Sequence, residues 1–309
     1  MQGLEASSQW FANAGLAMLQ RDFAPVMDRI AAGLVGRGSE CFGFDDQISQ
    51  DHDFELRFAL FLTAEDDRKF GFQLERAYRQ LRKDTLPAQS SSAASKLGDM
   101  EHGVIIIGDF YQRHLGFPGE PTDFRQWLYT PEYAFAEATN GAVFYDGLGE
   151  FTRIRQTLLH NMPEDVRKKK LAARAAVMAQ SGQYNYMRCI KHGEAGAAAL
   201  ALDDFVRNAV SMIFLLNGRF APYYKWMFRA MRNLPKLGDL ADGLEKLLNC
   251  RHEPANTVQL VEDIASAIIR ELKNQNLTSS SDNYLEAHAF EIMQRITSQE
   301  IRSLHIMEG

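Results

Sequence analysis

A glycine–serine pair followed by two aspartates, enclosed between two apolar segments, constrains the fold of this chain more than any other feature. Ala31–Val35 is a short apolar segment that ends at a glycine, which is typical of a buried strand. Phe54–Leu62, read as FELRFALFL, has apolar side chains at alternate positions and predicts a second strand. Gly38-Ser39, eleven further residues and the sequence DHD at 51–53 stand between them. This order predicts two strands joined by a tight turn and an acidic segment.

The residue types in this stretch favour metal and phosphate chemistry. In an extended segment, Asp51 and Asp53 lie on the same face, where two ionised carboxylates repel and a divalent cation removes the repulsion. Gly38 allows a tight turn and a close approach of phosphate to the backbone, and Ser39 adds a hydroxyl. Together they indicate Mg²⁺-dependent phosphoryl or nucleotidyl transfer. The alternative, a solvated acidic strand end after an ordinary turn, would be favoured if either element stood alone.

The pattern of predicted elements divides the chain at residue 146. Residues 1–146 mix two early helices, a helix over 65–82 and further strands at 104–107 and 142–145. From residue 147 onward the apolar spacing is helical, with breaks at proline, glycine and asparagine. We therefore expect a mixed α+β domain over 1–146 and an all-α helical bundle over 147–309.

The motif and several later blocks resemble known families. The run GRGSECFGFDDQISQDHDF resembles the signature of the polymerase-β-like nucleotidyltransferase superfamily, and its full length is similar to the DUF4037 nucleotidyltransferase-like family. The blocks at 140–158, 181–194 and 214–231 also resemble that family. The resemblance implies a nucleotidyltransferase fold with a small mixed sheet, in which Gly38 and Ser39 hold the nucleotide phosphates and Asp51 and Asp53 bind Mg²⁺ or Mn²⁺ and act in catalysis.

A third carboxylate and a contribution from the helical half are also implied. Superfamily enzymes usually carry a third catalytic carboxylate, for which Asp146 is preferred here and Asp109 and Glu101 are the alternatives. In the helical half, the nucleotide-binding candidates are Arg219, Tyr224 and Lys225. An aromatic-rich helix start that only packs is the competing interpretation of that block. The basic run at 167–170 is expected to be a solvated helix face.

These features predict an enzyme that moves a nucleoside monophosphate from an NTP, with ATP expected, to an unidentified acceptor. The acceptor could be a small molecule, a protein or an RNA end. The alternative is a non-catalytic nucleotide-binding or regulatory module, or a toxin–antitoxin component, of the same fold. A third carboxylate within reach of Asp51 and Asp53 would separate the enzyme from the module.

Composition limits the partners and the location. The net charge of −6 makes nucleic acid a less favoured partner. Three widely spaced cysteines, none in a CxxC arrangement, are typical of a reduced intracellular protein. The sequence MQGLEASSQWF lacks the pattern of a signal peptide, and no apolar run is long enough to cross a bilayer, so we expect a cytoplasmic protein without a membrane partner.

Overall fold

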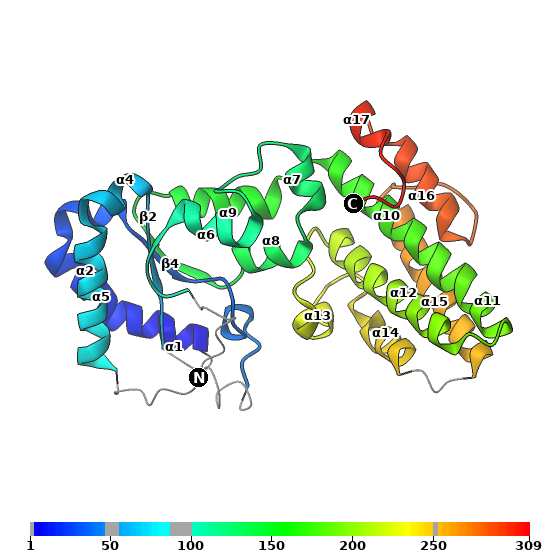
Figure 1. Ribbon diagram of the computed structural model, residues 1–309, viewed down its shortest axis with the longest axis horizontal. Helices are drawn as coiled ribbons and strands as arrows, with labels where there is room; N and C mark the ends of the chain where they lie inside the picture. Colours follow the sequence, from blue (N-terminus) through cyan, green and yellow to red (C-terminus); the bar gives the residue numbers. More distant parts are fainter. Residues whose placement is uncertain (1–2, 47–55, 87–100, 250–252) are drawn as a thin grey trace. The chain divides into compact units, whose positions relative to one another are not determined.

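The computed structural model describes residues 3–46, 56–86, 101–249 and 253–309, which form two compact units (Figure 1). The first unit is Met1–Thr122 with Ala134–Asn161, and the second is Asp123–Tyr133 with Met162–Gly309. This division differs from the boundary expected at residue 146. Helix α9 (Glu150–His160) packs with the first unit because its Phe151 ring stacks on Phe61 of the sheet, with ring centroids 4.2 Å apart.

The first unit is built on a four-stranded mixed sheet, as the sequence predicted. Its order is β3-β2-β1-β4. β1 runs antiparallel to both β2 and β4, whereas β2 and β3 are parallel. The strands are β1 (Ala31–Leu34), β2 (Ala59–Leu62), β3 (Gly103–Ile106) and β4 (Ala142–Asp146).

Helices cover both faces of this sheet, and the alternation of side chains along β2 explains how. Phe58, Leu60 and Leu62 belong to one aromatic-rich core with Trp10 and Tyr78. Phe61 points to the other face and contacts aromatic rings of α6 and α9. Figure 1 shows α2 and α5 on one side of β2 and α6 and α9 on the other. The helical segments of this unit are α1 (Gly3–Trp10), η1 (Phe11–Gly15), α2 (Leu16–Asp22), η2 (Ala24–Arg29), η3 (Glu40–Phe42), α4 (Ala64–Asp66), η4 (Asp67–Gly71), α5 (Phe72–Thr85), α6 (Ile107–Leu115) and α9.

The second unit contains helices and no strand in its described residues, which agrees with the predicted helical bundle. Its longest helix, α12, is buried along most of one side, and a Cβ on Gly182 would lie 2.3 Å from Phe205 of that helix. Helix α8 (Glu132–Thr139) begins in this unit and ends in the first. The other segments are α7 (Phe124–Tyr129), α10 (Glu164–Met178), η5 (Ala179–Asn185), α11 (Tyr186–Lys191), α12 (Ala195–Leu216), α13 (Tyr224–Met231), η6 (Gly238–Leu240), α14 (Ala241–Leu248), α15 (Pro254–Asn274), α16 (Leu285–Gln294) and α17 (Gln299–Arg302).

Two lysines of the basic run lie inside the second unit, so the solvated face expected over 167–170 is wrong for them. Lys169 and Lys170 are buried on α10. The ammonium group of Lys170 donates to the carbonyl of Leu128 over 2.8 Å, and that of Lys169 donates to the carbonyl of Ile306 over 3.2 Å. Burial lowers the pKa of each lysine to about 8.

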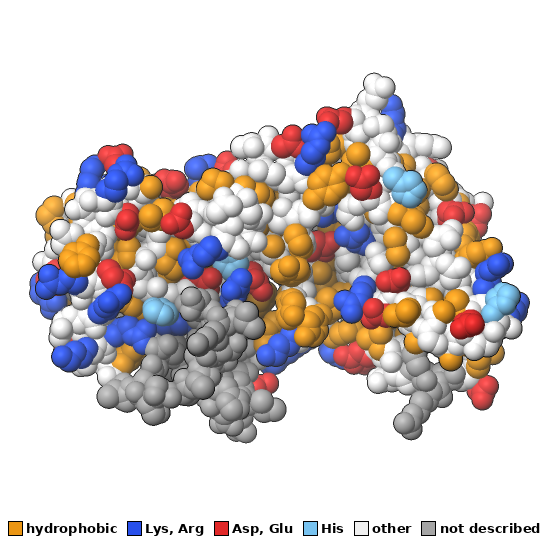
Figure 2. All heavy atoms as spheres, in the orientation of Figure 1, with side chains coloured by type: hydrophobic (Ala, Val, Ile, Leu, Met, Phe, Trp, Pro, Cys, Tyr) orange, Lys and Arg blue, Asp and Glu red, His pale blue; other side chains and the backbone are white. Residues whose placement is uncertain are grey.

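Surface charge and helix length bear on the expected partners. Figure 2 shows acidic and basic side chains interspersed over the face that it displays. Across the described residues, every helix is too short or too polar to cross a membrane.

Candidate functional site

The tight turn expected after β1 is present and depends on glycine. Gly36 and Gly38 have φ angles of +95° and +122°, which L side chains rarely adopt. A Cβ on Gly36 would lie 2.4 Å from a carboxylate oxygen of Glu101, and a Cβ on Gly38 would lie 2.6 Å from one of Glu40. Both backbone conformation and space therefore require glycine at these two positions.

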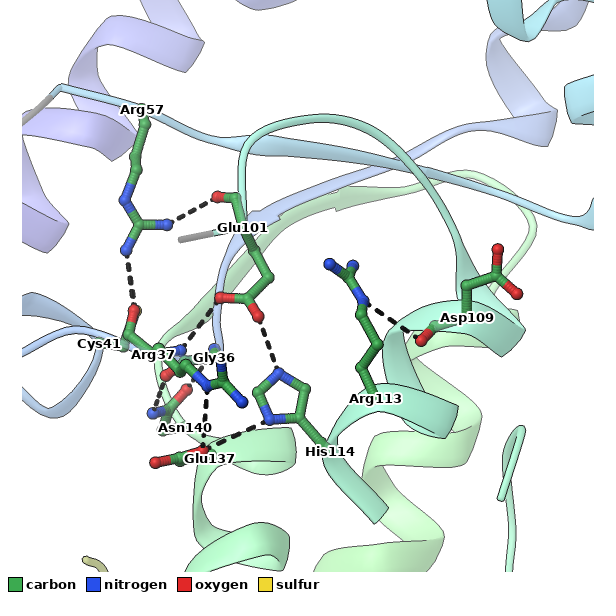
Figure 3. A network of polar contacts seen from close by, with 10 residues as sticks. All are labelled: Gly36, Arg37, Cys41, Arg57, Glu101, Asp109, Arg113, His114, Glu137 and Asn140. Atoms are coloured by element: carbon green, nitrogen blue, oxygen red, sulfur yellow. Dashed lines mark hydrogen bonds and ion pairs between the residues drawn. The ribbon is translucent and has the colours of Figure 1, made fainter. Parts of the chain in front are cut away.

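Arg57 connects this turn to two other segments of the chain (Figure 3). Its side chain is fully buried in the segment that leads into β2. One guanidinium nitrogen donates to the carbonyl of Glu101 over 2.6 Å. A second donates to the carbonyl of Arg37 over 2.9 Å and to the carboxylate of Glu40 over 2.6 Å. One side chain thus holds the turn, the start of β2 and the start of β3 together.

A second group of buried side chains supports the turn from the opposite direction. Oε1 of Glu101 lies 2.9 Å from Nε2 of His114, and Nδ1 of His114 lies 3.5 Å from Oε2 of Glu137. The other carboxylate oxygen of Glu101 accepts from the backbone N–H of Arg37 over 3.1 Å. Figure 3 shows His114 between the two carboxylates.

These contacts change the pKa values of both partners. Burial alone would lower the pKa of His114, but its bonds to Glu101 and Glu137 outweigh burial and raise that pKa above its ordinary value. Burial alone would raise the pKa of Glu101, but the hydrogen bond and charge of His114 and the N–H of Arg37 lower it. Each partner therefore stabilises the charged form of the other.

Asn140 and Gly141 complete the support of the turn. The side-chain amide of Asn140 donates to the carbonyl of Gly36 over 2.7 Å and accepts from its N–H over 2.8 Å. The N–H of Gly141 donates to the carbonyl of Cys41 over 2.7 Å. The amide acts as a peptide group would and extends the pairing of β1 with β4 beyond Leu34.

Two donors of the turn remain for a ligand. Among the described residues, none accepts from the backbone N–H groups of Gly38 and Ser39, which lead into the short helix η3. Ser39 makes no side-chain cap bond to that helix. Backbone N–H groups in such a turn suit an anion such as phosphate. Asp51 and Asp53, predicted to hold the metal, lie outside the described residues.

The structure does not bring Asp146 to this turn. β1 and β4 are antiparallel, so Asp146 pairs with Ala31 at the opposite end of β1 from the turn. At about 3.3 Å per residue, Ala31 lies about 10 Å from Leu34 along the strand. The carboxylate of Asp146 instead accepts from the N–H groups of Gly149 and Thr152 and caps α9. The preference for Asp146 as the third carboxylate is therefore not supported by its position.

Of the three carboxylates considered, Glu101 alone contacts the turn. Asp109 is exposed in the first turn of α6 and lines a cavity of 880 Å³ together with Glu101. Glu101 stands at the start of β3, which is parallel to β2. From the sequence, Glu101 was only an alternative to Asp146, and Arg57 and His114 were not among the candidates. Arg57 is the only charged residue in the apolar run LRFALFL at 56–62. A charge in a predicted buried strand indicates that the side chain has an acidic or polar partner in the fold.

The predicted residues of the helical half lie together in the second unit. Arg219 is exposed in the connection between α12 and α13. Tyr224 is the first residue of α13 and is 61% exposed. The ammonium group of Lys225 lies 5.1 Å from the centre of the Trp226 ring. These three residues are thus exposed near the start of one helix, whereas Gly38 and Ser39 belong to the other unit.

Comparisons with known proteins support the family resemblance. Residues 127–227 match the family model described as domain of unknown function DUF4037. The matched residues include the blocks at 140–158 and 181–194 and most of 214–231, whereas the GSE…DHD run lies before them. The resemblance to this family is therefore confirmed over residues 127–227.

A search of curated proteins found no match. Among solved structures, a nucleotidyltransferase-like protein from Exiguobacterium sibiricum is 12% identical and covers 92% of this chain and 81% of its own, with a TM-score of 0.37. The function of this chain therefore has to be inferred from its own residues.

Proposed function

We propose that this chain is a Mg²⁺- or Mn²⁺-dependent nucleotidyltransferase that moves a nucleoside monophosphate from an NTP, with ATP first among them, to an acceptor. The observation that carries the proposal is the anchored turn. Gly38 and Ser39 offer two N–H groups, and Arg57, four positions after Asp53 in the sequence, is bonded to the same turn. The phosphate donors and the segment after the two aspartates are thereby tied to each other. A cytoplasmic location remains our expectation.

The donor chemistry fits a hard divalent cation. Asp51 and Asp53 would hold the metal, which when bound would neutralise negative charge on the phosphates. In the described part of the chain, no group of three His, Cys, Asp or Glu side chains could hold a metal ion, so the two aspartates are the proposed ligands. The N–H groups of Gly38 and Ser39 would bind phosphate oxygens, and Arg57 and Glu101 would keep them in place.

One observation favours the non-catalytic alternative, a nucleotide-binding module. Glu101 is the one of the three candidate carboxylates that contacts the turn, but one of its oxygens is bonded to His114 and the other to the N–H of Arg37. A carboxylate occupied in this way positions the turn and does not act as the third catalytic carboxylate.

The test is transfer of label from each α-³²P-labelled NTP to components of a cell extract, with and without Mg²⁺. We expect Mg²⁺-dependent labelling by the wild type and its loss in Asp53→Asn, because one metal ligand is removed. Asp28→Asn, which changes an exposed aspartate of the same unit, is the control and should retain labelling.

Thermal unfolding with NTP and Mg²⁺ separates the alternatives. Ligand at a hundredfold excess over Kd should stabilise the protein by about 2.7 kcal/mol. Stabilisation without labelling would favour the binding module over the enzyme. If none of the four NTPs shifts the melting temperature at millimolar concentration, both functions fail.

A further inference from the structure

The second unit contains a cavity that the proposed function does not use. It has a volume of 390 Å³ and lies among the start of α8, the helices α10 and α12, and the start of α13. Small-molecule sites usually measure about 300–1,000 Å³. All of its lining residues fall between 131 and 227, within the stretch that matches DUF4037.

Three tyrosines give this cavity exposed aromatic faces. Tyr133, Tyr223 and Tyr224 line it and are 43%, 42% and 61% exposed. The ring centroids of Tyr133 and Tyr223 are 5.9 Å apart, and those of Tyr223 and Tyr224 are 4.3 Å apart. Pro222 and Met227 add apolar surface. The exposed ring faces favour a flat ligand that packs against them.

The acidic side chain of the cavity is already compensated. Glu132 is 8% exposed, and its Oε1 accepts from the hydroxyl of Ser211 over 2.6 Å and from the guanidinium of Arg174 over 3.2 Å. Its Oε2 accepts from the N–H of Ala221 over 3.4 Å. A carboxylate neutralised in this way does not select a cationic ligand.

A second arginine of the lining has guanidinium nitrogens available for an anion. Arg207 is exposed on α12 and lines the same cavity. Its Nε donates to Asp203 over 2.7 Å, and Asp203 is not part of the lining. Arg174 is paired with Glu132 and Arg207 with Asp203, so the terminal guanidinium nitrogens of Arg207 are the cationic donors left to bind an anionic group in the cavity.

We propose that this cavity binds a compact planar ring that carries a phosphate or carboxylate group. The ring packs on Tyr223 and Tyr224, and the anionic group is bound by Arg207. A nucleoside monophosphate and an aromatic acid share this chemistry. The proposal does not depend on transfer activity, because it concerns binding to the second unit in the absence of metal.

The test is a set of ligand titrations followed by NMR on the full chain in Mg²⁺-free buffer. Benzoate and phenyl phosphate have the expected anionic group, and benzyl alcohol and benzylamine are the matched neutral and cationic probes. We expect the anions to bind at least tenfold more tightly than the alcohol, and the amine to bind least. AMP represents the nucleoside monophosphates, and benzoate represents the aromatic acids. The probe that binds more tightly shows which of these two ligand classes fits the cavity better.

Three variants locate the binding. Arg207→Glu should reverse the preference, so that benzylamine binds more tightly than benzoate, and Tyr224→Ala should weaken all probes about tenfold. Arg270→Glu changes an exposed arginine of α15 outside the cavity and should leave the anion preference intact. Equal binding of benzoate and benzylamine by the wild type, equal effects of the two arginine variants, or no binding of any probe would overturn the proposal.

Discussion

The two units bury charged side chains in different ways. Next to the Gly36–Ser39 turn of the first unit, opposite charges meet directly, as in the pairs of Arg57 with Glu40 and His114 with Glu101. In the second unit, Glu132 pairs with Arg174 in the same way, but the ammonium groups of Lys169 and Lys170 donate to backbone carbonyls. The first arrangement joins several segments at fixed positions, whereas the second fills the inner face of one helix.

The pKa values of the buried groups differ between the two arrangements. Direct pairing outweighs burial in the first unit, so the pKa of His114 is raised and that of Glu101 is lowered. Carbonyl dipoles do not outweigh burial in the second, and the pKa of Lys170 falls to about 8. A direct contact with an ionised partner therefore outweighs the effect of burial on the pKa of His114 and Glu101, whereas burial prevails at Lys170.

The largest expected effect on stability comes from replacing Arg57, the buried cation next to the Gly36–Ser39 turn. Arg57→Met would leave the carboxylate of Glu40 and the carbonyls of Arg37 and Glu101 without this donor. Breaking a buried pair in this way should lower the free energy of unfolding by about 3–5 kcal/mol. Urea denaturation measures it, with the exposed Arg68→Met as the control, expected to change stability by less than about 0.5 kcal/mol. A loss no greater than that of the control would show that pairing does not stabilise this region.

A smaller effect on stability is expected from Glu101→Gln, which keeps the shape of the side chain but removes its charge. The pKa of His114 should fall, because Glu101 is the first of the partners that raise it. NMR titration of the imidazole measures this change, and Glu101→Gln should destabilise the protein by roughly 1–3 kcal/mol.

The pH dependence of that loss has a definite sign. Glu101 has a folded pKa below 4.5, and His114 has one above 6.5. Stability from the pair is therefore fully present between about pH 4.5 and 6.5 and is lost as the pH rises through the folded pKa of His114. Denaturation at pH 5.5 and pH 9 should show a larger difference between wild type and variant at pH 5.5. The same difference at both values would contradict the pairing.

The smallest effect per pH unit concerns the second arrangement. Lys170 has a folded pKa of about 8 and an ordinary value of 10.5, so between these pH values the unfolded chain binds a proton that the folded chain does not. Its contribution to stability should rise with pH across that window, by up to about 1.4 kcal/mol per pH unit. Lys170→Met should remove this rise, and the exposed Lys246→Met should retain it. Identical slopes in wild type and Lys170→Met would mean that Lys170 is charged when folded.

Local patterns predicted the parts of the fold that depend on neighbouring residues. The turn after β1 follows from Gly36 and Gly38, whose backbone conformations suit only glycine. The helical second half follows from apolar spacing, and the mixed sheet from short apolar runs. These elements were predictable because each is determined within a few residues of sequence.

Contacts between distant segments could not be predicted in the same way. Lys170 is buried because Leu128, 42 positions away, covers it, and nothing in the run RKKK indicates that contact. Glu101 rather than Asp146 lies at the turn because strand direction decides which end of each strand meets it. That direction depends on the pairing of whole strands, which spacing within one strand does not reveal.

The amide of Asn140 also affects the chemical lifetime of the protein. Asn-Gly sequences such as Asn140-Gly141 are thermolabile, because the glycine nitrogen attacks the asparagine amide and the side chain becomes acidic. Here the amide is bonded on both sides to Gly36, and the glycine N–H donates to Cys41, so both reacting groups are held by the fold. Deamidation of Asn140 would replace the amide nitrogen that donates to the carbonyl of Gly36 with a carboxylate oxygen. Two acceptor oxygens would then face each other without a hydrogen bond. The folded turn therefore protects the residue that supports it, and damage should accumulate in chains that have unfolded.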